Sequence, residues 1–361
     1  MIQPIAPVVG VKRQVTLRVF LSGRCNLRCK YCFVDKSGLG FAKPKLGNFK
    51  KAIDLFSQLG YQQKNIDITG GEPFLYFDRL KALCEYAFRV IPGLSISITT
   101  NATLISDKHL PFLRNNKIDL KLSIDGRKHD HDANRFYHLR PRVSTYPRIL
   151  ETINLLYRNN IKLKAVVVYG PETFKKLYSN VKYLQNIGFE QVDFYPDLFA
   201  LWDNARLKGL NKELAKVFRI KGLGNSLVSA ALSNNNTFKF ENCNSFSVDP
   251  SGTFFSCDKV FSLPKSIRAK FACGSIATGI NYGKKYNQLK KARNVGCLLM
   301  ESSCGDCKYQ KYCFCPIGIF IYTKNKGLDS AIYFKSFCEI SKIYGKNIMR
   351  LVSREKNHEI K

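Results

Sequence analysis

Over the first 200 positions, segments with a strand-like pattern of hydrophobic and polar residues are followed by segments with a helical pattern. Residues 15–21 alternate apolar and polar side chains, as a half-buried strand does, and residues 51–59 carry apolar side chains at helical spacing. The same succession recurs along the chain. It predicts strands at 15–21, 65–69, 94–99, 118–124, 161–169 and 191–195, and helices at 51–59, 75–90, 104–113, 149–158 and 174–187.

Six strand–helix units in series indicate an α/β fold with a parallel sheet and right-handed crossovers. Six units suit an open, partial (β/α)6 TIM-like barrel better than the closed barrel of eight. In such folds the active site lies at the carboxyl ends of the strands, so the segments that follow the strands are expected to carry the chemistry.

The pattern changes after about residue 200. Residues 221–237 are rich in Gly and Asn, which is typical of a surface connection, and a cysteine-rich region follows. A chain of 361 residues suits two domains. We therefore expect a core barrel at 15–215, a small Cys-rich domain at 240–340 and a basic C-terminal tail at 341–361.

Thirteen cysteines are present, while no signal peptide and no apolar run of about 18 residues is found. These features predict a cytoplasmic protein without membrane association, in which cysteines hold metal rather than form disulfides.

The net charge of +31 is extreme, and residues 259–293 contain nine Lys or Arg and no acidic residue. Two interpretations stay open. One is a solvated basic surface, and the other is an acidic peptide or nucleic-acid partner. No nucleic-acid-binding motif accompanies the charge, so a nucleic-acid partner is not favoured.

Cys25, Cys29 and Cys32 follow the first strand with the spacing Cys-x3-Cys-x2-Cys. Zinc sites favour Cys-x2-Cys pairs and four ligands. Three thiolates instead suit a [4Fe–4S] cluster with one iron left open for a substrate or cosubstrate. This motif, with the aromatic Tyr31 before the last cysteine, resembles that of the radical S-adenosylmethionine (SAM) superfamily.

The resemblance implies that the open iron binds the amine and carboxylate of SAM. Reductive cleavage of SAM would then release methionine and a 5′-deoxyadenosyl radical that abstracts a hydrogen atom from the substrate. It also implies an electron donor such as flavodoxin or ferredoxin.

Gly70, Gly71 and Glu72 follow the second predicted strand, and Asn101 follows the third. Each segment by itself reads as a turn or a capped strand end. By resemblance, the Gly-Gly-Glu segment would bind the SAM amine, because glycines let the backbone approach a ligand closely. Asn101 would contact the ribose or methionine part of SAM.

The segment Ser123-Ile124-Asp125-Gly126 is followed by His131-Asp132-Ala133-Asn134-Arg135. This stretch is similar to Ser-x-Asp-Gly…His-Asp-x-x-Arg of radical SAM peptide-modifying enzymes. The resemblance implies that Ser123 and Arg135 reach the SAM carboxylate, and a guanidinium suits this because it binds carboxylates bidentately. His129 and His131 are expected on the surface.

The C-terminal cysteines resemble the SPASM extension of that superfamily, which holds two auxiliary [4Fe–4S] clusters. By resemblance, the outer cluster would be bound by Cys304, Cys307, Cys313 and Cys338, and the inner one by Cys243, Cys257 and Cys315. Cys313 and Cys315 are separated by one residue where the family has three. Cys273, Cys297 or an open site are the alternatives for the fourth inner position.

Asp258 follows Cys257 directly. By resemblance to sulfatase-maturing relatives it would act as a base on the substrate, and the alternative is an Asp in a solvated or capping role. Cys84 lies within a helical apolar pattern and is expected to be a core residue.

The combined resemblance implies a maturase that abstracts a hydrogen atom from a peptide or protein and forms a crosslink, thioether or oxidised side chain. An acidic leader on that substrate would suit the basic surface. Two enzymatic alternatives remain, a sulfatase-maturing enzyme that makes formylglycine and a small-molecule radical SAM enzyme. An alternative of another class is a basic nucleic-acid-binding Fe–S protein.

Overall fold

The computed structural model describes residues 14–34, 43–116, 118–220, 222–224, 244–299, 307–309, 323 and 327–359, with the backbone alone at 289, 292–299 and 354–359. Six strands pair in parallel in chain order, as the alternation of patterns predicted. They are β1 (Gln14–Phe20), β2 (Gln63–Thr69), β3 (Ser95–Thr100), β4 (Asp119–Ser123), β5 (Lys164–Tyr169) and β6 (Gln191–Pro196).

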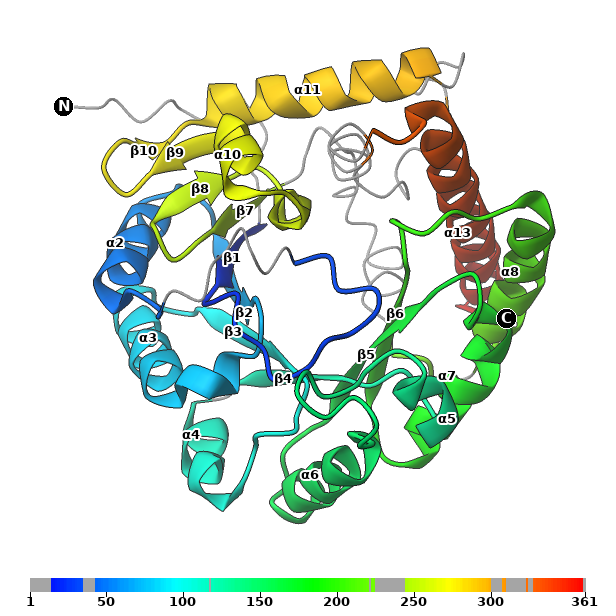
Figure 1. The fold of residues 1–361 in the computed structure, drawn as a ribbon, viewed down its shortest axis with the longest axis horizontal. Coiled ribbons are helices and arrows are strands. Elements are labelled where there is room, and N and C mark those ends of the chain that lie inside the picture. Colours follow the sequence, from blue (N-terminus) through cyan, green and yellow to red (C-terminus); the bar gives the residue numbers. More distant parts are fainter. Residues whose placement is uncertain are drawn as a thin grey trace.

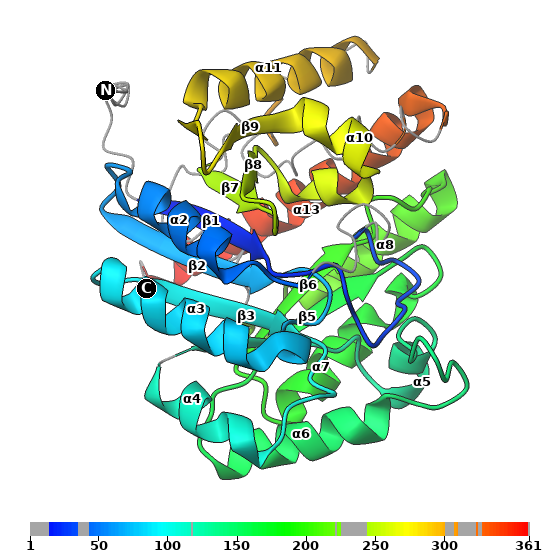
Figure 2. The same ribbon diagram turned by 60° about the vertical axis from the view of Figure 1, so that its left-hand side comes forward.

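Helices connect these strands and lie along the outer side of the arc that the strands form in Figure 1. Figure 2 shows the first two helices side by side over the first strands. The helices are α2 (Leu46–Ser57), α3 (Phe77–Val90), α4 (Leu110–Asn115), α5 (Lys128–Asp132), α6 (Tyr146–Arg158), α7 (Leu177–Asn186) and α8 (Asn204–Val217), with 3-10 turns at Pro73–Tyr76, Asp107–His109 and Phe174–Lys176. The helix α8 was not predicted.

The two faces of the sheet differ because successive side chains point to opposite sides. On β1, Leu17 and Val19 are fully buried against the helices, whereas Arg18 between them is 37% exposed on the inner side of the arc. Cys84 of α3 is fully buried in the same core, which confirms its expected role as a core residue. The inner, polar side is therefore the side on which a substrate can be held.

Beyond residue 244 the chain continues the same sheet. β7 (Ser245–Val248) pairs in parallel with β1, and three antiparallel strands follow it, so that the described strands form a ten-stranded sheet. The further elements are β8 (Thr253–Phe255), β9 (Ala272–Ser275), β10 (Gly279–Ile280), α10 (Lys265–Arg268) and α11 (Tyr282–Leu299), with 3-10 turns at Asp258–Ser262 and Ala269–Phe271. The segment predicted as a separate small domain thus shares backbone hydrogen bonds with the core sheet.

Residues 341–359, expected as part of a basic tail, belong instead to the helix α13 (Ser330–Glu359). Tyr344 of this helix is fully buried, and its hydroxyl lies 2.5 Å from that of Tyr169 on β5 and donates to the Phe194 carbonyl of β6. Apolar burial and these hydrogen bonds hold α13 against the last two parallel strands, next to α8 (Figure 1). Among the described helices, none is long and apolar enough to cross a membrane.

Candidate SAM and iron–sulfur site

The cysteine loop, residues 21–34, leaves the carboxyl end of β1 and carries Cys25, Cys29 and Cys32. One side of the loop pairs with the segment after α5. The Arg28 N–H donates to the Phe136 carbonyl at 2.9 Å, and the Lys30 N–H donates to the Asn134 carbonyl at 2.9 Å. The loop is therefore held by backbone contacts to a segment more than 100 residues away.

The Gly70-Gly71-Glu72 loop holds the other side of the cysteine loop. The Gly71 N–H donates to the Ser22 carbonyl at 2.7 Å, and the Glu72 N–H donates to the Arg24 carbonyl at 2.8 Å. Gly70 adopts a φ of 125°, which favours glycine because it has no Cβ. The two motifs, 38 residues apart from Cys32 to Gly70, thus meet directly at the carboxyl edge of the sheet.

Glu72 is 2% exposed, and its carboxylate accepts three hydrogen bonds. The donors are the Thr100 hydroxyl at 2.6 Å, the Asn101 N–H at 2.8 Å and the Phe74 N–H at 3.1 Å. Burial nevertheless raises the pKa of Glu72 to about 7. A ligand ammonium group beside this carboxylate would favour its ionised form, which is the chemistry expected of the SAM-amine site.

Asn101 links Glu72 to the first cysteine. Its side-chain amide donates to the Asn26 side-chain oxygen at 2.9 Å and contacts the Cys25 Sγ at 3.8 Å. The Leu27 N–H also donates to the Cys25 Sγ, at 3.3 Å. Burial, followed by the nearby Glu72, raises the pKa of Cys25 to about 12. The structure therefore brings the predicted residues Cys25, Glu72 and Asn101 into one cluster.

The three thiols share this loop, but as placed they do not converge on one point. Within the described ranges, no group of three or more Cys, His, Asp or Glu side chains could hold a metal ion as it stands. The donor set nevertheless fits a cluster, because three thiols lie in one loop and the Cys25 sulfur already accepts N–H donors that would stabilise a thiolate.

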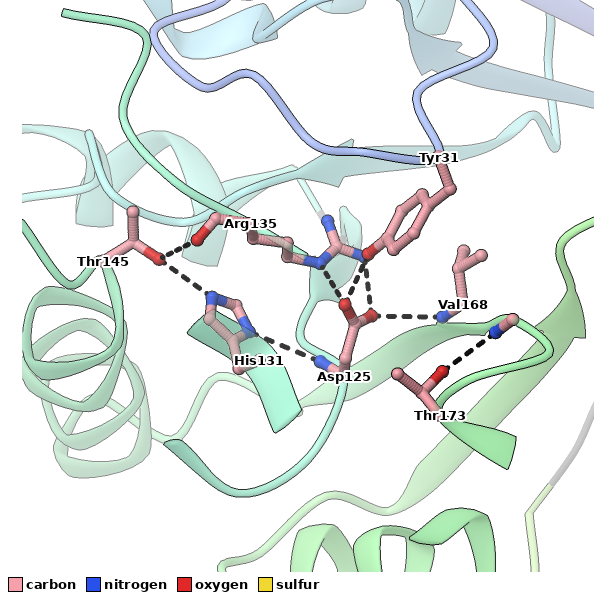
Figure 3. Close-up of polar contacts among 8 residues, drawn as sticks. Tyr31, Asp125, His131, Arg135, Thr145, Val168 and Thr173 are labelled. Atoms are coloured by element: carbon pink, nitrogen blue, oxygen red, sulfur yellow. Dashed lines mark hydrogen bonds and ion pairs between the residues drawn. The ribbon is translucent and has the colours of Figure 1, made fainter. Parts of the chain in front are cut away.

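Arg135, predicted to bind the SAM carboxylate, makes a bidentate ion pair with Asp125 (Figure 3). Its Nε and Nη2 each lie 3.0 Å from an Asp125 carboxylate oxygen, and the two side chains are 6% and 4% exposed. The predicted partner Ser123 ends β4 and is half-buried. The carboxylate fork of Arg135 is therefore already used within the protein, which the sequence did not reveal.

Tyr31 and His131 complete this arrangement. The Tyr31 hydroxyl donates to Asp125 at 2.5 Å, and the Arg135 guanidinium lies 5.2 Å from the centre of the Tyr31 ring. His131, expected on the surface, is fully buried, whereas the His129 side chain is 95% exposed. Burial lowers the pKa of His131 to about 4, so the ring is neutral. The expectation for His131 was wrong because short helix α5 turns it inward, toward Thr145.

Asp258 is held as an ionised carboxylate beside the inner side of the sheet. Its Oδ2 lies 3.1 Å from the Arg18 Nη1 and 3.3 Å from the Lys259 Nζ. Burial alone would raise the pKa of Asp258, but Lys259 and Arg18 outweigh it and hold this pKa well below its usual range. A carboxylate stabilised in this way is a weak proton acceptor as it stands.

Cys257 lies two residues after the end of the short strand β8 and belongs to a second apolar cluster. This cluster joins Phe20 and Val34, which flank the cysteine loop, to Phe261, whose ring stacks on Phe20 at 3.8 Å. The Phe33 ring also lies 4.2 Å from the Lys259 Nζ. The segment that carries Cys257 is therefore packed against both ends of the cysteine loop.

The remaining C-terminal cysteines are only partly described. Burial raises the pKa of the half-buried Cys338; Lys342 opposes this shift, and Glu339 and Cys307 add to it. Cys273 of β9 is fully buried. The predicted ligands Cys243, Cys304, Cys313 and Cys315 lie outside the described residues, as does the side chain of Cys297.

Comparison with known proteins identifies the core. The family model of the radical SAM superfamily matches residues 19–184. This match spans the cysteine loop, the Gly-Gly-Glu loop and the Asp125–Arg135 pair. Residues 19–184 therefore form a radical SAM domain. A radical SAM domain implies SAM and a [4Fe–4S] cluster that binds it.

Three relatives show the breadth of this superfamily. The chain is 26% identical to a cysteine-type anaerobic sulfatase-maturating enzyme of Clostridium novyi, over 49% of each chain. It is 26% identical to a GTP 3′,8-cyclase of Clostridium perfringens, over 56% of this chain and 61% of the relative. The solved structure of native anSMEcpe with bound AdoMet and Cp18Cys peptide superposes with a TM-score of 0.69 at 19% identity, covering 94% of this chain and 99% of the other.

The structural likeness shows a shared fold, since the identity is low. The matches to the first curated relatives span only 49–61% of the lengths of those proteins. The activity of the whole protein and its substrate are therefore matters for proposal.

Proposed function

We propose that this radical SAM enzyme abstracts a hydrogen atom from a peptide or protein substrate. The observation that carries the proposal is the direct backbone pairing of the cysteine loop with the Gly-Gly-Glu loop, which unites a three-thiol set with the buried Glu72 carboxylate. A bound cluster and SAM would supply the electron and the 5′-deoxyadenosyl radical.

The residues of this chain would bind and orient that cosubstrate. Cys25, Cys29 and Cys32 would hold the cluster, and Glu72 would bind the SAM amine. Asn101 would keep Glu72 and Cys25 in place through the hydrogen bonds described above. The strands that carry these loops pack on a continuous apolar core, which would favour a fixed distance between SAM and substrate.

The C-terminal region would bind two auxiliary [4Fe–4S] clusters in a SPASM arrangement. Cys307 and Cys338, whose thiols interact electrostatically, would share the outer cluster, and Cys257 would belong to the inner one. Packing of Phe20 and Phe33 against the segment after β8 supports a fixed spacing between the inner cluster and the SAM cluster.

A peptide substrate is favoured by two observations. Relatives of this chain include a sulfatase-maturating enzyme and a fold neighbour solved with a peptide. The net charge of +31 would favour a peptide with an acidic segment. A small-molecule substrate is the second candidate, because GTP 3′,8-cyclases are matched over a similar length.

Anaerobic reconstitution with iron and sulfide, followed by reduction in the presence of SAM, tests the core of the proposal. We expect 5′-deoxyadenosine from the wild type and none from Cys25→Ala, whereas Cys84→Ala, which removes a core thiol, retains the activity. A wild-type chain that carries its cluster and yields no 5′-deoxyadenosine would refute it.

The substrate class needs a separate assay. Candidate peptides encoded beside this gene, a Cys-containing sulfatase peptide and GTP are each incubated with enzyme and SAM, and products are measured by mass. Loss of hydrogen from a peptide supports the proposal. Conversion of GTP alone would refute it and support a small-molecule substrate.

A further inference from the structure

We propose that Asp125 is a positioning residue that couples the cysteine loop to the arginine of the SAM-carboxylate site. The inference rests on the proposed function, since it concerns how this chain prepares that site. Asp125 follows β4 and lies in the region where Tyr31, Arg135 and β5 meet (Figure 3).

The Asp125 carboxylate is saturated by donors from three other segments. Its Oδ1 accepts from the Arg135 Nη2 at 3.0 Å and from the Val168 N–H of β5 at 3.1 Å. Its Oδ2 accepts from the Arg135 Nε at 3.0 Å and from the Tyr31 hydroxyl at 2.5 Å. Two acceptor positions per oxygen are thereby filled, so Asp125 itself has no capacity left for a ligand.

This arrangement decides which part of Arg135 can meet a ligand. Asp125 binds the edge formed by Nε and Nη2, and Tyr31 lies against the guanidinium at 5.2 Å. The Nη1 nitrogen lies outside the pairing with Asp125. A SAM carboxylate would therefore meet the remaining N–H groups at the Nη1 end rather than the Nε–Nη2 edge, and the direction of that end is set by Asp125.

The backbone around the pair is held by a second chain of hydrogen bonds. The Asp125 N–H donates to the His131 Nδ1 at 3.4 Å, which leaves the proton of the neutral ring on Nε2. Nε2 then donates to the Thr145 hydroxyl at 2.9 Å, and that hydroxyl donates to the Arg135 carbonyl at 3.4 Å. Both the side chains and the main chains of Asp125 and Arg135 are thus connected.

Gly126 adds a constraint on the position of Asp125. Its φ is 131°, and a Cβ there would lie 2.1 Å from the Asn180 side chain of α7. Asn180 is 3% exposed and accepts from the Arg127 N–H at 3.1 Å, so it has little room to move. Packing of Gly126 against Asn180 therefore fixes the position of the turn that carries Asp125.

Tyr31 connects the Asp125–Arg135 pair to the predicted cluster ligands, because it immediately precedes Cys32. Asp125 holds this tyrosine and Arg135 with the same carboxylate, although Tyr31 and Asp125 are 94 residues apart. Displacement of the cysteine loop would therefore change the hydrogen bonding of Arg135, and loss of Asp125 would release both.

The test measures SAM affinity of the reconstituted chain and of its Asp125→Asn, Tyr31→Phe and doubly substituted variants. Affinity is read from the change that SAM causes in the paramagnetic spectrum of the reduced cluster, and iron content is measured on the same samples. In Asp125→Asn an amide NH2 faces the guanidinium, so we expect SAM to bind about 10- to 100-fold more weakly, the factor for one lost charged hydrogen bond.

The decisive comparison is the effect of removing the Tyr31 hydroxyl in each background. In the wild type, Tyr31→Phe should weaken SAM binding about 3- to 10-fold, the range for one neutral hydrogen bond. In Asp125→Asn it should have a smaller effect, because the amide keeps one acceptor oxygen for the four donors that the two carboxylate oxygens serve in the wild type. Equal factors in both backgrounds, or unchanged affinity in Asp125→Asn, would overturn the coupling.

Asp203→Asn is the matched control, since Asp203 pairs with Arg206 in an exposed position on α8 and the same substitution should leave SAM affinity unchanged. If Asp125→Asn does not fold, Tyr31→Phe alone decides, and wild-type affinity and iron content in that variant would overturn the proposal. Formation of 5′-deoxyadenosine by the wild type is scored separately. Absence of 5′-deoxyadenosine refutes the proposed function. Its presence, together with additive effects of the two substitutions on SAM affinity, refutes only the role of Asp125.

Discussion

Gly71→Ala tests the close contact between the two loops of the SAM site. A Cβ on Gly71 would lie 1.9 Å from the Arg24 carbonyl oxygen and 2.9 Å from the Gly23 carbonyl carbon. Both are backbone atoms, so no flexible side chain can move aside. Relief of the overlap to an ordinary contact requires the loops to separate by more than about 1 Å.

That separation would break both backbone hydrogen bonds between the loops. Their present lengths of 2.7 and 2.8 Å would grow to nearly 4 Å, beyond hydrogen-bonding range. Two lost hydrogen bonds cost about 1–3 kcal/mol, and overpacking costs about 1–3 kcal/mol more. We therefore expect Gly71→Ala to lower the free energy of unfolding by about 2–6 kcal/mol and to reduce iron retention.

Urea unfolding followed by circular dichroism measures the first quantity, and Gly47→Ala provides the control. Gly47 lies in α2, and a Cβ there would meet no atom within 4 Å. Both substitutions restrict the unfolded chain alike, but Gly47→Ala should stabilise the protein by about 0.5–1 kcal/mol. Equal stability of the two variants would show that the loops are not apposed as described.

Further substitutions probe the core, the carboxylate site and the C-terminal helix. Cys84→Ala should lower stability by about 1–2 kcal/mol, as loss of a small buried side chain does, and leave iron content per chain unchanged; a loss of iron would make Cys84 a ligand. Glu72→Gln places an amide beside the Asn101 N–H, so we expect a cost of about 1–3 kcal/mol and weaker SAM binding, and wild-type affinity would argue against this residue as the amine site. Tyr344→Phe removes the hydroxyl pair with Tyr169 and should cost about 1–3 kcal/mol in urea unfolding, whereas no cost would show that apolar packing alone holds α13.

Local patterns along the chain determined the strand order, the meeting of the two loop motifs and the burial of Cys84. Strand alternation and helical spacing predicted the order of the six parallel strands, because each element buries one face and its period is visible in the sequence. The cysteine motif and the Gly-Gly-Glu segment are each local, and both follow parallel strands, so their meeting at one sheet edge was predictable from topology. The buried Cys84 was predictable from its helical pattern for the same reason.

Contacts between distant segments were decided only by the tertiary structure. Arg135 was expected to face a ligand, yet a buried guanidinium needs a carboxylate, and Asp125 is the one that the fold brings to it. The inward position of His131, the pairing of β7 with β1 and the burial of Tyr344 likewise depend on which surfaces meet. The sequence therefore indicated candidate residues for the chemistry, while long-range packing decided which of them hold one another in place.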